Sequence, residues 1–131
     1  MKQRQNLFIE LWTAALRSGE FDQGSDTLGS VGNSVELYSC LGVACEVFNR
    51  MCESEQAGLT KANKLRRLEQ DGLILFDNET NLLPMRMFVL LDLKSLNPLE
   101  LYSSTKTFKE IAKQLEPYKL FNGRSKHEKQ G

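Results

Sequence analysis

The feature that most constrains the fold is the apolar segment 40–53, with the sequence CLGVACEVFNRMCE. If this segment is a helix, successive residues turn by about 100°, and its apolar residues share one broad arc. Its polar residues lie on the opposite side: Glu46, Asn49, Arg50 and Glu53. A helix with so broad an apolar arc has to be covered by other elements. We therefore predict that it is deeply buried.

The cysteines of this segment have two possible explanations, a metal or redox site and plain packing. On a helix, Cys40 and Cys45 point about 140° apart, and two turns separate Cys45 from Cys52 by about 10 Å. A disulfide needs Cα atoms within about 7 Å, and zinc needs every ligand at about 2.3 Å from one ion. We therefore predict buried free thiols that fill space, with no metal ion and no cofactor.

Catalytic residues are not indicated by the sequence. A nucleophilic cysteine would need a base beside it, and the only imidazole, His127, lies in a polar terminal segment. The acidic residues that could form a catalytic pair lie among polar neighbours, as solvated carboxylates do: Asp22, Asp26, Glu36 and Glu46. We therefore expect a protein that is not an enzyme.

Size and charge narrow the class of protein further. The chain of 131 residues has the length of one domain, and its 17 acidic and 17 basic residues balance. A neutral chain has no overall attraction to nucleic acid or to an anionic membrane. No segment reaches the roughly 20 apolar residues of a membrane span, and no signal peptide is recognisable. With three cysteines, an odd number, we expect reduced thiols and a cytoplasmic location.

The start of the chain predicts a helix at residues 6–18. Its apolar residues form two adjacent rows: Leu7, Leu11 and Ala15 in one, and Phe8, Trp12 and Leu16 in the other. Gly19 follows as a C-terminal stop. The glycine-rich stretch 22–36 predicts a loose hairpin with strands near Thr27–Leu28 and Val35–Tyr38. Residues Leu73–Phe76 predict a further strand, followed by a turn at 77–81.

Three more helices are predicted from caps and stops. Thr60 would cap a helix at Lys61–Gln70, which Gly72 would end. Pro84 suits the first turn of a helix at Met85–Leu91. The last helix begins at a capping box formed by Thr107 and Glu110.

Together these elements predict an α+β fold in a single globular domain over residues 1–121. We expect four or five helices and a small antiparallel sheet built from 27–38 and 73–83. The polar tail at 122–131 has no apolar residue, and we expect it to be mobile.

A DNA-binding function is an alternative that the segment 61–83 raises. A basic helix followed by strand, turn and strand is typical of a winged-helix domain, in which the helix would contact DNA. The DNA-contacting residues would be Lys61, Lys64, Arg66 and Arg67. The same residues could form a solvated basic surface offset by Glu69 and Asp71, and the long link before them is unlike the short turn of that motif.

A small ligand is another possibility, bound by the first helix and the loop after it. Trp12 and Tyr38 could offer a stacking face, and Arg17 and Gln23 could offer hydrogen bonds. Trp12 also has a simpler interpretation, since a tryptophan on the apolar stripe of a helix is more often part of the core.

Several segments, in order, resemble a family of small uncharacterised proteins from bacteriophages and bacterial genomes. That family has the patterns W-x-x-ALRSG-x-[YF]-x-Q, a [YF]CCLGVLCD-like segment, an LP-containing segment ending in GL, and F-x-E-I-A. The matching residues here are Trp12, Ala15, Leu16, Arg17, Ser18, Gly19, Phe21, Gln23, Tyr38, Cys40, Leu41, Gly42, Val43, Cys45, Pro84, Phe108, Glu110, Ile111 and Ala112. Two departures are Ser39, where the family has a cysteine, and Asp92-Leu93 in place of GL.

The resemblance implies a setting rather than an activity: a small phage-type accessory protein in the cytoplasm of a bacterial host cell. Such a protein would act by stoichiometric binding, either as an inhibitor of a host protein or by sequestering a small nucleotide-like ligand. The binding residues would be the exposed members of the matching motif, Arg17, Ser18, Gln23 and Tyr38, with Trp12 beside them. We expect no membrane partner, place nucleic acid second, and leave a homodimer open.

Overall fold

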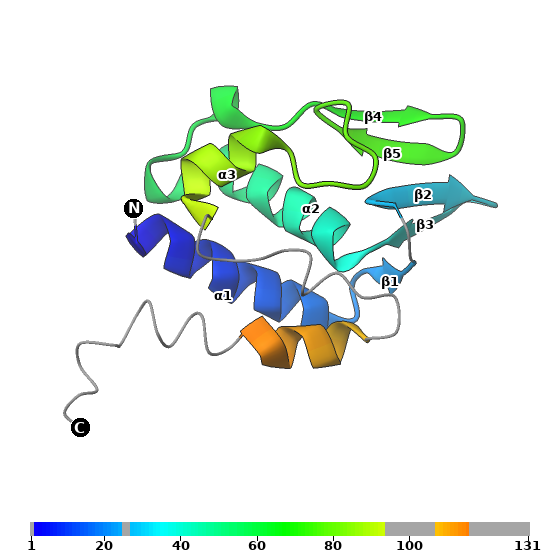
Figure 1. Ribbon diagram of the computed structural model, residues 1–131, viewed down its shortest axis with the longest axis horizontal. Helices are drawn as coiled ribbons and strands as arrows, with labels where there is room; N and C mark the ends of the chain where they lie inside the picture. Colours follow the sequence, from blue (N-terminus) through cyan, green and yellow to red (C-terminus); the bar gives the residue numbers. More distant parts are fainter. Residues whose placement is uncertain (1, 25–26, 94–106, 116–131) are drawn as a thin grey trace.

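Two helices and a small sheet form the centre of the protein, whose computed structural model describes residues 2–24, 27–93 and 107–115. Helix α1 (Lys2–Ser18) packs along helix α2 (Cys40–Glu53), and α2 lies between α1 and the sheet (Figure 1). Helix α3 (Met85–Leu91) and a helix at 108–115 complete the described helices. The predicted α+β class is confirmed. No helix among these residues is long and apolar enough to cross a membrane.

The sheet has five strands in the order β1-β3-β2-β5-β4. Their bounds are β1 (Asp22–Gln23), β2 (Gly29–Gly32), β3 (Val35–Tyr38), β4 (Arg67–Gln70) and β5 (Leu73–Phe76). Neighbouring strands are antiparallel except β1, which runs parallel to β3. The sheet is therefore mixed, where a purely antiparallel one was expected. Strands β3 and β5 have the predicted bounds, and β2 begins after the predicted position at 27–28.

Both hairpins close through two residues with left-handed backbone. Asn33 and Ser34 join β2 to β3 with φ values of 52° and 65°, and Asp71 and Gly72 join β4 to β5 with 54° and 81°. Positive φ at both central residues is the signature of the turn whose twist matches paired strands. Asp-Gly is among the best sequences for such a turn, so it fixes the β4–β5 register.

The predicted helix at Lys61–Gln70 is wrong. Residues Lys61–Asn63 form one 3-10 turn, and Arg67–Gln70 form strand β4. The cause is the turn at Asp71 and Gly72, because a tight hairpin there requires the residues before it to be extended. The expected second strand after the 77–81 turn is also missing from the described residues, where only an isolated bridge between Phe76 and Glu79 is present.

Helix α2 is buried along most of its length, as predicted: eleven of its fourteen residues are inaccessible. Ser39 caps it, with its Oγ accepting a hydrogen bond of 3.2 Å from the Gly42 N–H. This explains why a serine is suitable where the resembling family has a cysteine. Asn49, expected on the polar side, is buried instead, where its amide donates to the Leu65 carbonyl and accepts from the Leu65 N–H.

The later helices agree with their sequence signals. Helix α3 has the predicted bounds, and the capping box is present, with Glu110 accepting from the Thr107 N–H at 2.7 Å. Asp92 ends α3 with φ of 54°, a left-handed conformation that glycine adopts most easily. The departure from the GL pattern is therefore tolerated because aspartate also accepts this backbone. The predicted tail at 122–131 lies outside the described residues.

We predict that Gly42→Ala lowers the free energy of unfolding by about 3 kcal/mol, because the added Cβ would lie 1.8 Å from the Leu28 carbonyl oxygen. This loss outweighs the roughly 1 kcal/mol that alanine gains over glycine in a helix. Gly32→Ala is the matched control, since nothing lies within 4 Å of its new Cβ. Urea unfolding of both variants would measure the difference, and equal stabilities would contradict the close packing of α2.

Candidate functional site

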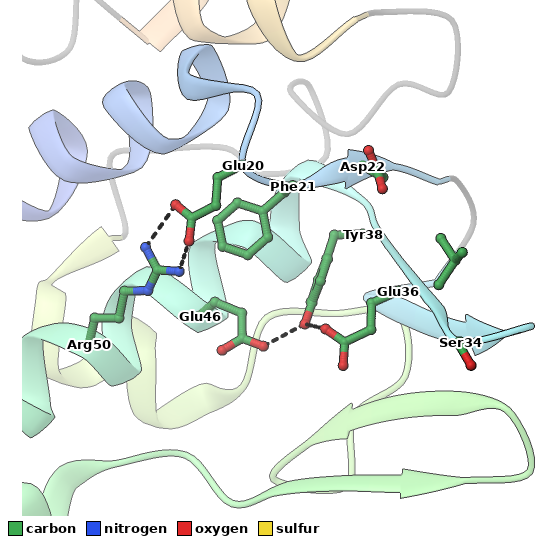
Figure 2. Close-up of a pocket in the computed structure, with 9 residues that line it drawn as sticks. Glu20, Phe21, Asp22, Ser34, Glu36, Tyr38, Glu46 and Arg50 are labelled. Carbon is green, nitrogen blue, oxygen red and sulfur yellow. Dashed lines mark hydrogen bonds and ion pairs between the residues drawn. The ribbon is translucent and has the colours of Figure 1, made fainter.

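A pocket of about 520 Å³ opens where β1, β3 and α2 meet (Figure 2). Residues from three separate segments line it: Glu20, Phe21, Asp22, Ser34, Val35, Glu36, Tyr38, Glu46 and Arg50. Glu46 and Arg50 are one helical turn apart on α2, on the side that faces away from the core. The pocket therefore forms at positions where α2 is left uncovered.

Tyr38 is the centre of a polar cluster on the inner wall of the pocket. Its hydroxyl lies 2.7 Å from Glu46 Oε2 and 2.9 Å from Glu36 Oε1, and accepts from Arg67 Nη2 at 3.1 Å. A phenol has one proton, so it donates to only one of the two carboxylates at a time. Burial raises the pKa of Tyr38, and the two carboxylates raise it further against the opposing effect of Arg67. We call Tyr38, Glu36, Glu46 and Arg67 the Tyr38 cluster.

Arg67 connects three elements through this cluster. From the edge strand β4 its guanidinium donates to Glu46 on α2 at 2.9 Å, to Glu36 on β3 at 3.2 Å and to Glu69 at 3.2 Å. Its side chain is 29% exposed. Burial lowers the pKa of Arg67, but hydrogen bonds to Tyr38, Glu46 and Glu69 raise it overall. The cluster therefore holds the carboxylates of Glu36 and Glu46 in fixed positions.

A second ion pair forms the outer wall. Arg50 binds Glu20 through both carboxylate oxygens, and this hydrogen bonding lowers the pKa of Glu20. The Arg50 guanidinium also lies 5.1 Å from the ring of Phe21, which meets Tyr38 edge to face. Figure 2 shows Phe21 beside Tyr38, between the Arg50–Glu20 pair and the hydrogen bonds that join Tyr38 to Glu36 and Glu46.

The charge of the pocket is negative. Four lining residues are acidic (Glu20, Asp22, Glu36 and Glu46) and one is basic, Arg50. Arg67 behind the wall adds a second guanidinium, which still leaves the carboxylates in excess. The potential therefore favours a cationic ligand over an anionic one.

The predicted binding residues are separated in the structure. Trp12 is fully buried and donates to the Cys40 carbonyl at 3.0 Å, so its prediction as a stacking face is wrong and its core interpretation holds. Arg17 and Ser18 are exposed at the end of α1, where the Ser18 hydroxyl donates to a backbone carbonyl. Gln23 accepts from the N–H of Phe108 and so positions the last helix. The other predicted residue, Tyr38, lies in the pocket.

A neighbouring groove of about 310 Å³ contains Ser18. It runs between α1 and α2 and is mostly apolar, with Leu11, Ala15 and Val47 among its lining residues. Glu20 and Arg50 line both this groove and the pocket, so their ion pair separates the two spaces.

The residues predicted to contact DNA do not form a helix. Lys61 lies in the 3-10 turn. Lys64, the residue just after that turn, pairs with Glu53 at 2.8 Å. Arg66 is exposed just before β4, and Arg67 is engaged in the Tyr38 cluster. The recognition helix on which the winged-helix interpretation depends is therefore absent from this segment.

The three thiols are buried, as predicted. Burial raises the pKa of Cys40 to about 12 and that of Cys52 to about 11, and it raises the pKa of Cys45 well above its usual range. Within the described ranges, no group of three or more His, Cys, Asp or Glu side chains could hold a metal ion. Protonated, inaccessible thiols have little nucleophilic character.

The sequence analysis named Asp22, Glu36 and Glu46 only as solvated carboxylates, and it did not predict that they form one pocket with Glu20, Phe21 and Arg50. One signal was available: Glu46 and Arg50 are four residues apart on α2, so their side chains lie on the same polar side of the helix. Their partners Glu20 and Glu36 come from distant segments, and no local pattern could have assigned them.

The sequence of the chain matches the model of one protein family over residues 1–123, a domain of unknown function designated DUF8296. The chain belongs to this family. No curated protein and no solved structure shows significant similarity to it. The DUF8296 match covers α1, the sheet, α2 and α3, and with them every residue of the pocket.

We predict that alkaline pH destabilises the protein through its thiols. An unfolded cysteine has a pKa of about 8.5, so between this value and the higher folded values the unfolded state has lost protons that the folded state keeps. Each such thiol lowers the free energy of unfolding by about 1.4 kcal/mol per pH unit. Urea titrations from pH 8 to 10.5 should show this fall, and Cys45→Ala should reduce the slope by about one proton. An unchanged slope would mean that Cys45 is accessible.

Two arginines of the site allow a matched comparison. Arg67→Gln should lower the free energy of unfolding by about 2 kcal/mol, because it leaves the buried Tyr38 and the partly buried Glu46 without their cation. Arg50→Gln should cost about 0.5 kcal/mol, because the Arg50–Glu20 pair is about half exposed to solvent. Thermal and urea unfolding would measure both, and a larger effect at Arg50 would contradict the assignment of the Tyr38 cluster as the structural one.

Proposed function

We propose that the chain is a non-enzymatic binding protein that acts stoichiometrically on a partner protein, and that its pocket accepts a basic side chain of that partner. The observation that carries this proposal is the excess of carboxylates around an aromatic wall. Glu36 and Glu46 are held in place by Tyr38 and Arg67, so a cation would meet acceptors that are already oriented. Such preorganisation reduces the entropy lost on binding.

A lysine or arginine side chain fits this chemistry well. Its charged end would bond to carboxylate oxygens, and charge-assisted bonds are about twice as strong as neutral ones. Its carbon chain would lie along Phe21 and Val35, which the pocket exposes beside the acids. Asp22 at β1 adds a further carboxylate.

The charge also discriminates between the two kinds of ligand that the sequence suggested. A nucleotide phosphate would meet four carboxylates, and the one guanidinium among the described lining residues, that of Arg50, already bonds Glu20. Like charges at such distances repel. A host protein with an accessible basic side chain is therefore favoured over a nucleotide-like ligand at this pocket.

The biological setting of the proposal rests on the sequence resemblance. A phage-type accessory protein in the host cytoplasm would bind one host protein and so inhibit it. This activity needs a shaped, charged surface and does not require catalytic groups.

The first experiment titrates the ¹⁵N-labelled protein with the short peptide Ac-Gly-Arg-Gly-NH₂. We expect amide shifts at Phe21, Glu36 and Tyr38, weakening as salt is raised because the pocket is open to solvent. The double variant Asp22→Asn/Glu36→Gln should weaken binding at least fivefold, whereas Glu55→Gln, an exposed acid away from the pocket, should not.

Two control ligands test whether the pocket prefers a basic side chain to an acidic one or a nucleotide. The peptide Ac-Gly-Glu-Gly-NH₂ and adenosine monophosphate should leave the pocket amides unshifted. Stronger binding of the nucleotide at these residues, or no response to the arginine peptide at millimolar concentration, would overturn it. A pull-down from bacterial lysate with the wild type and the double variant then identifies the partner, which the variant should fail to retain.

A further inference from the structure

Strand β4 is one edge of the described sheet, and half of its backbone groups point away from β5. The Asp77 N–H donates to the Arg66 carbonyl at 2.8 Å. The backbone carbonyl of Arg66 therefore points toward the side of β5. Hydrogen-bonding direction alternates along an antiparallel strand, so Leu68 faces β5 and Arg67 and Glu69 face outward. Figure 1 shows β4 as the outermost strand on its side. Arg67 and Glu69 thus offer N–H and C=O groups to a further strand.

We propose that this edge pairs with β4 of a second copy of the chain, antiparallel and with Leu68 on the two-fold axis. In this register Arg67 lies opposite the partner's Glu69, and Glu69 lies opposite the partner's Arg67. Both pairs use the outward backbone groups, so each forms two backbone hydrogen bonds. The two five-stranded sheets become one continuous sheet.

The charges of β4 select this register over its neighbours. Three antiparallel registers use the outward groups of Arg67 and Glu69. One places Arg67 opposite the partner's Arg67, and another places Glu69 opposite the partner's Glu69. Directly opposed like charges destabilise a strand pair, whereas opposite charges stabilise it. Only the register centred on Leu68 opposes acid to base twice, so β4 is self-complementary.

The side chains on the two faces agree with this pairing. Arg67 and Glu69 point to the face that carries Phe76 and Ile74, their register partners in the core. Leu68 points to the other face with Leu75 and is only partly buried in the single chain. Across the two-fold axis it would meet the partner's Leu68 in a position where side chains approach closely. The pairing therefore covers apolar surface as well as polar backbone.

Because the two-fold axis is perpendicular to the sheet, both Tyr38 clusters lie on the same face of the joined sheet. The dimer would present two pockets toward one side. The pairing of the two β4 strands does not depend on what the pocket binds. A failure of the arginine-peptide titration would therefore leave this inference intact.

The most direct test of this register compares two single cysteine variants of β4 for disulfide formation between the two copies. Leu68→Cys places a thiol directly beside its own copy in the partner, within the range of a disulfide. Gln70→Cys is the matched control on the same face of β4, because its two copies would lie four residues apart along the strands, roughly 13 Å. The native thiols are buried and do not compete. Under mild oxidation we expect a covalent dimer of Leu68→Cys only.

Sedimentation of the full chain supplies the second measurement. We expect the wild type to show a concentration-dependent dimer, and Glu69→Lys to raise its dissociation constant at least tenfold by opposing like charges twice. Glu55→Lys makes the same change of charge away from β4 and should leave the constant unchanged. A wild type that stays monomeric at several hundred micromolar, or equal cross-linking of the two cysteine variants, would overturn the proposal.

Discussion

The burial of α2 is the constraint on which the rest of the structure depends. Because eleven of its fourteen residues are inaccessible, α1 has to pack along it and the sheet has to cover another side. Ser39 and Gly42 allow the helix to begin close against the chain before it. The positions left open include Glu46 and Arg50, and the pocket forms there. The location of the pocket therefore follows from which residues of α2 are left outside the core.

The sequence predicted the elements that local signals define. The apolar arc predicted α2, and Pro84 predicted the start of α3. The turn residues of the glycine-rich stretch predicted β3, and a short apolar run predicted β5. It failed at residues 61–70, where basic residues and a threonine cap favour a helix on local grounds. The Asp71-Gly72 turn overrides that preference by pairing the segment with β5, because hydrogen bonds to a neighbouring strand satisfy its backbone.

The candidate site was only partly within reach of sequence reasoning, and Tyr38 was the one predicted residue that it contains. Trp12 has a polar N–H, but a backbone carbonyl in the core satisfies it. Arg67 was identified as a cation for DNA, whereas three acidic partners from α2, β3 and its own strand engage it. Contacts of this kind join residues up to 31 positions apart. They follow from the arrangement of the elements and not from any local pattern.

Native-state amide hydrogen exchange tests the central role of α2 most directly, because it reports the free energy of opening residue by residue. The amides from Val43 to Cys52 should exchange more slowly than any others, with a free energy equal to that of global unfolding measured by urea. Amides of the pocket rim at Asp22 and Ser34 should exchange through smaller local openings. If α2 instead exchanged at a clearly lower free energy than α1 and β5, it would not be the element around which the molecule is built.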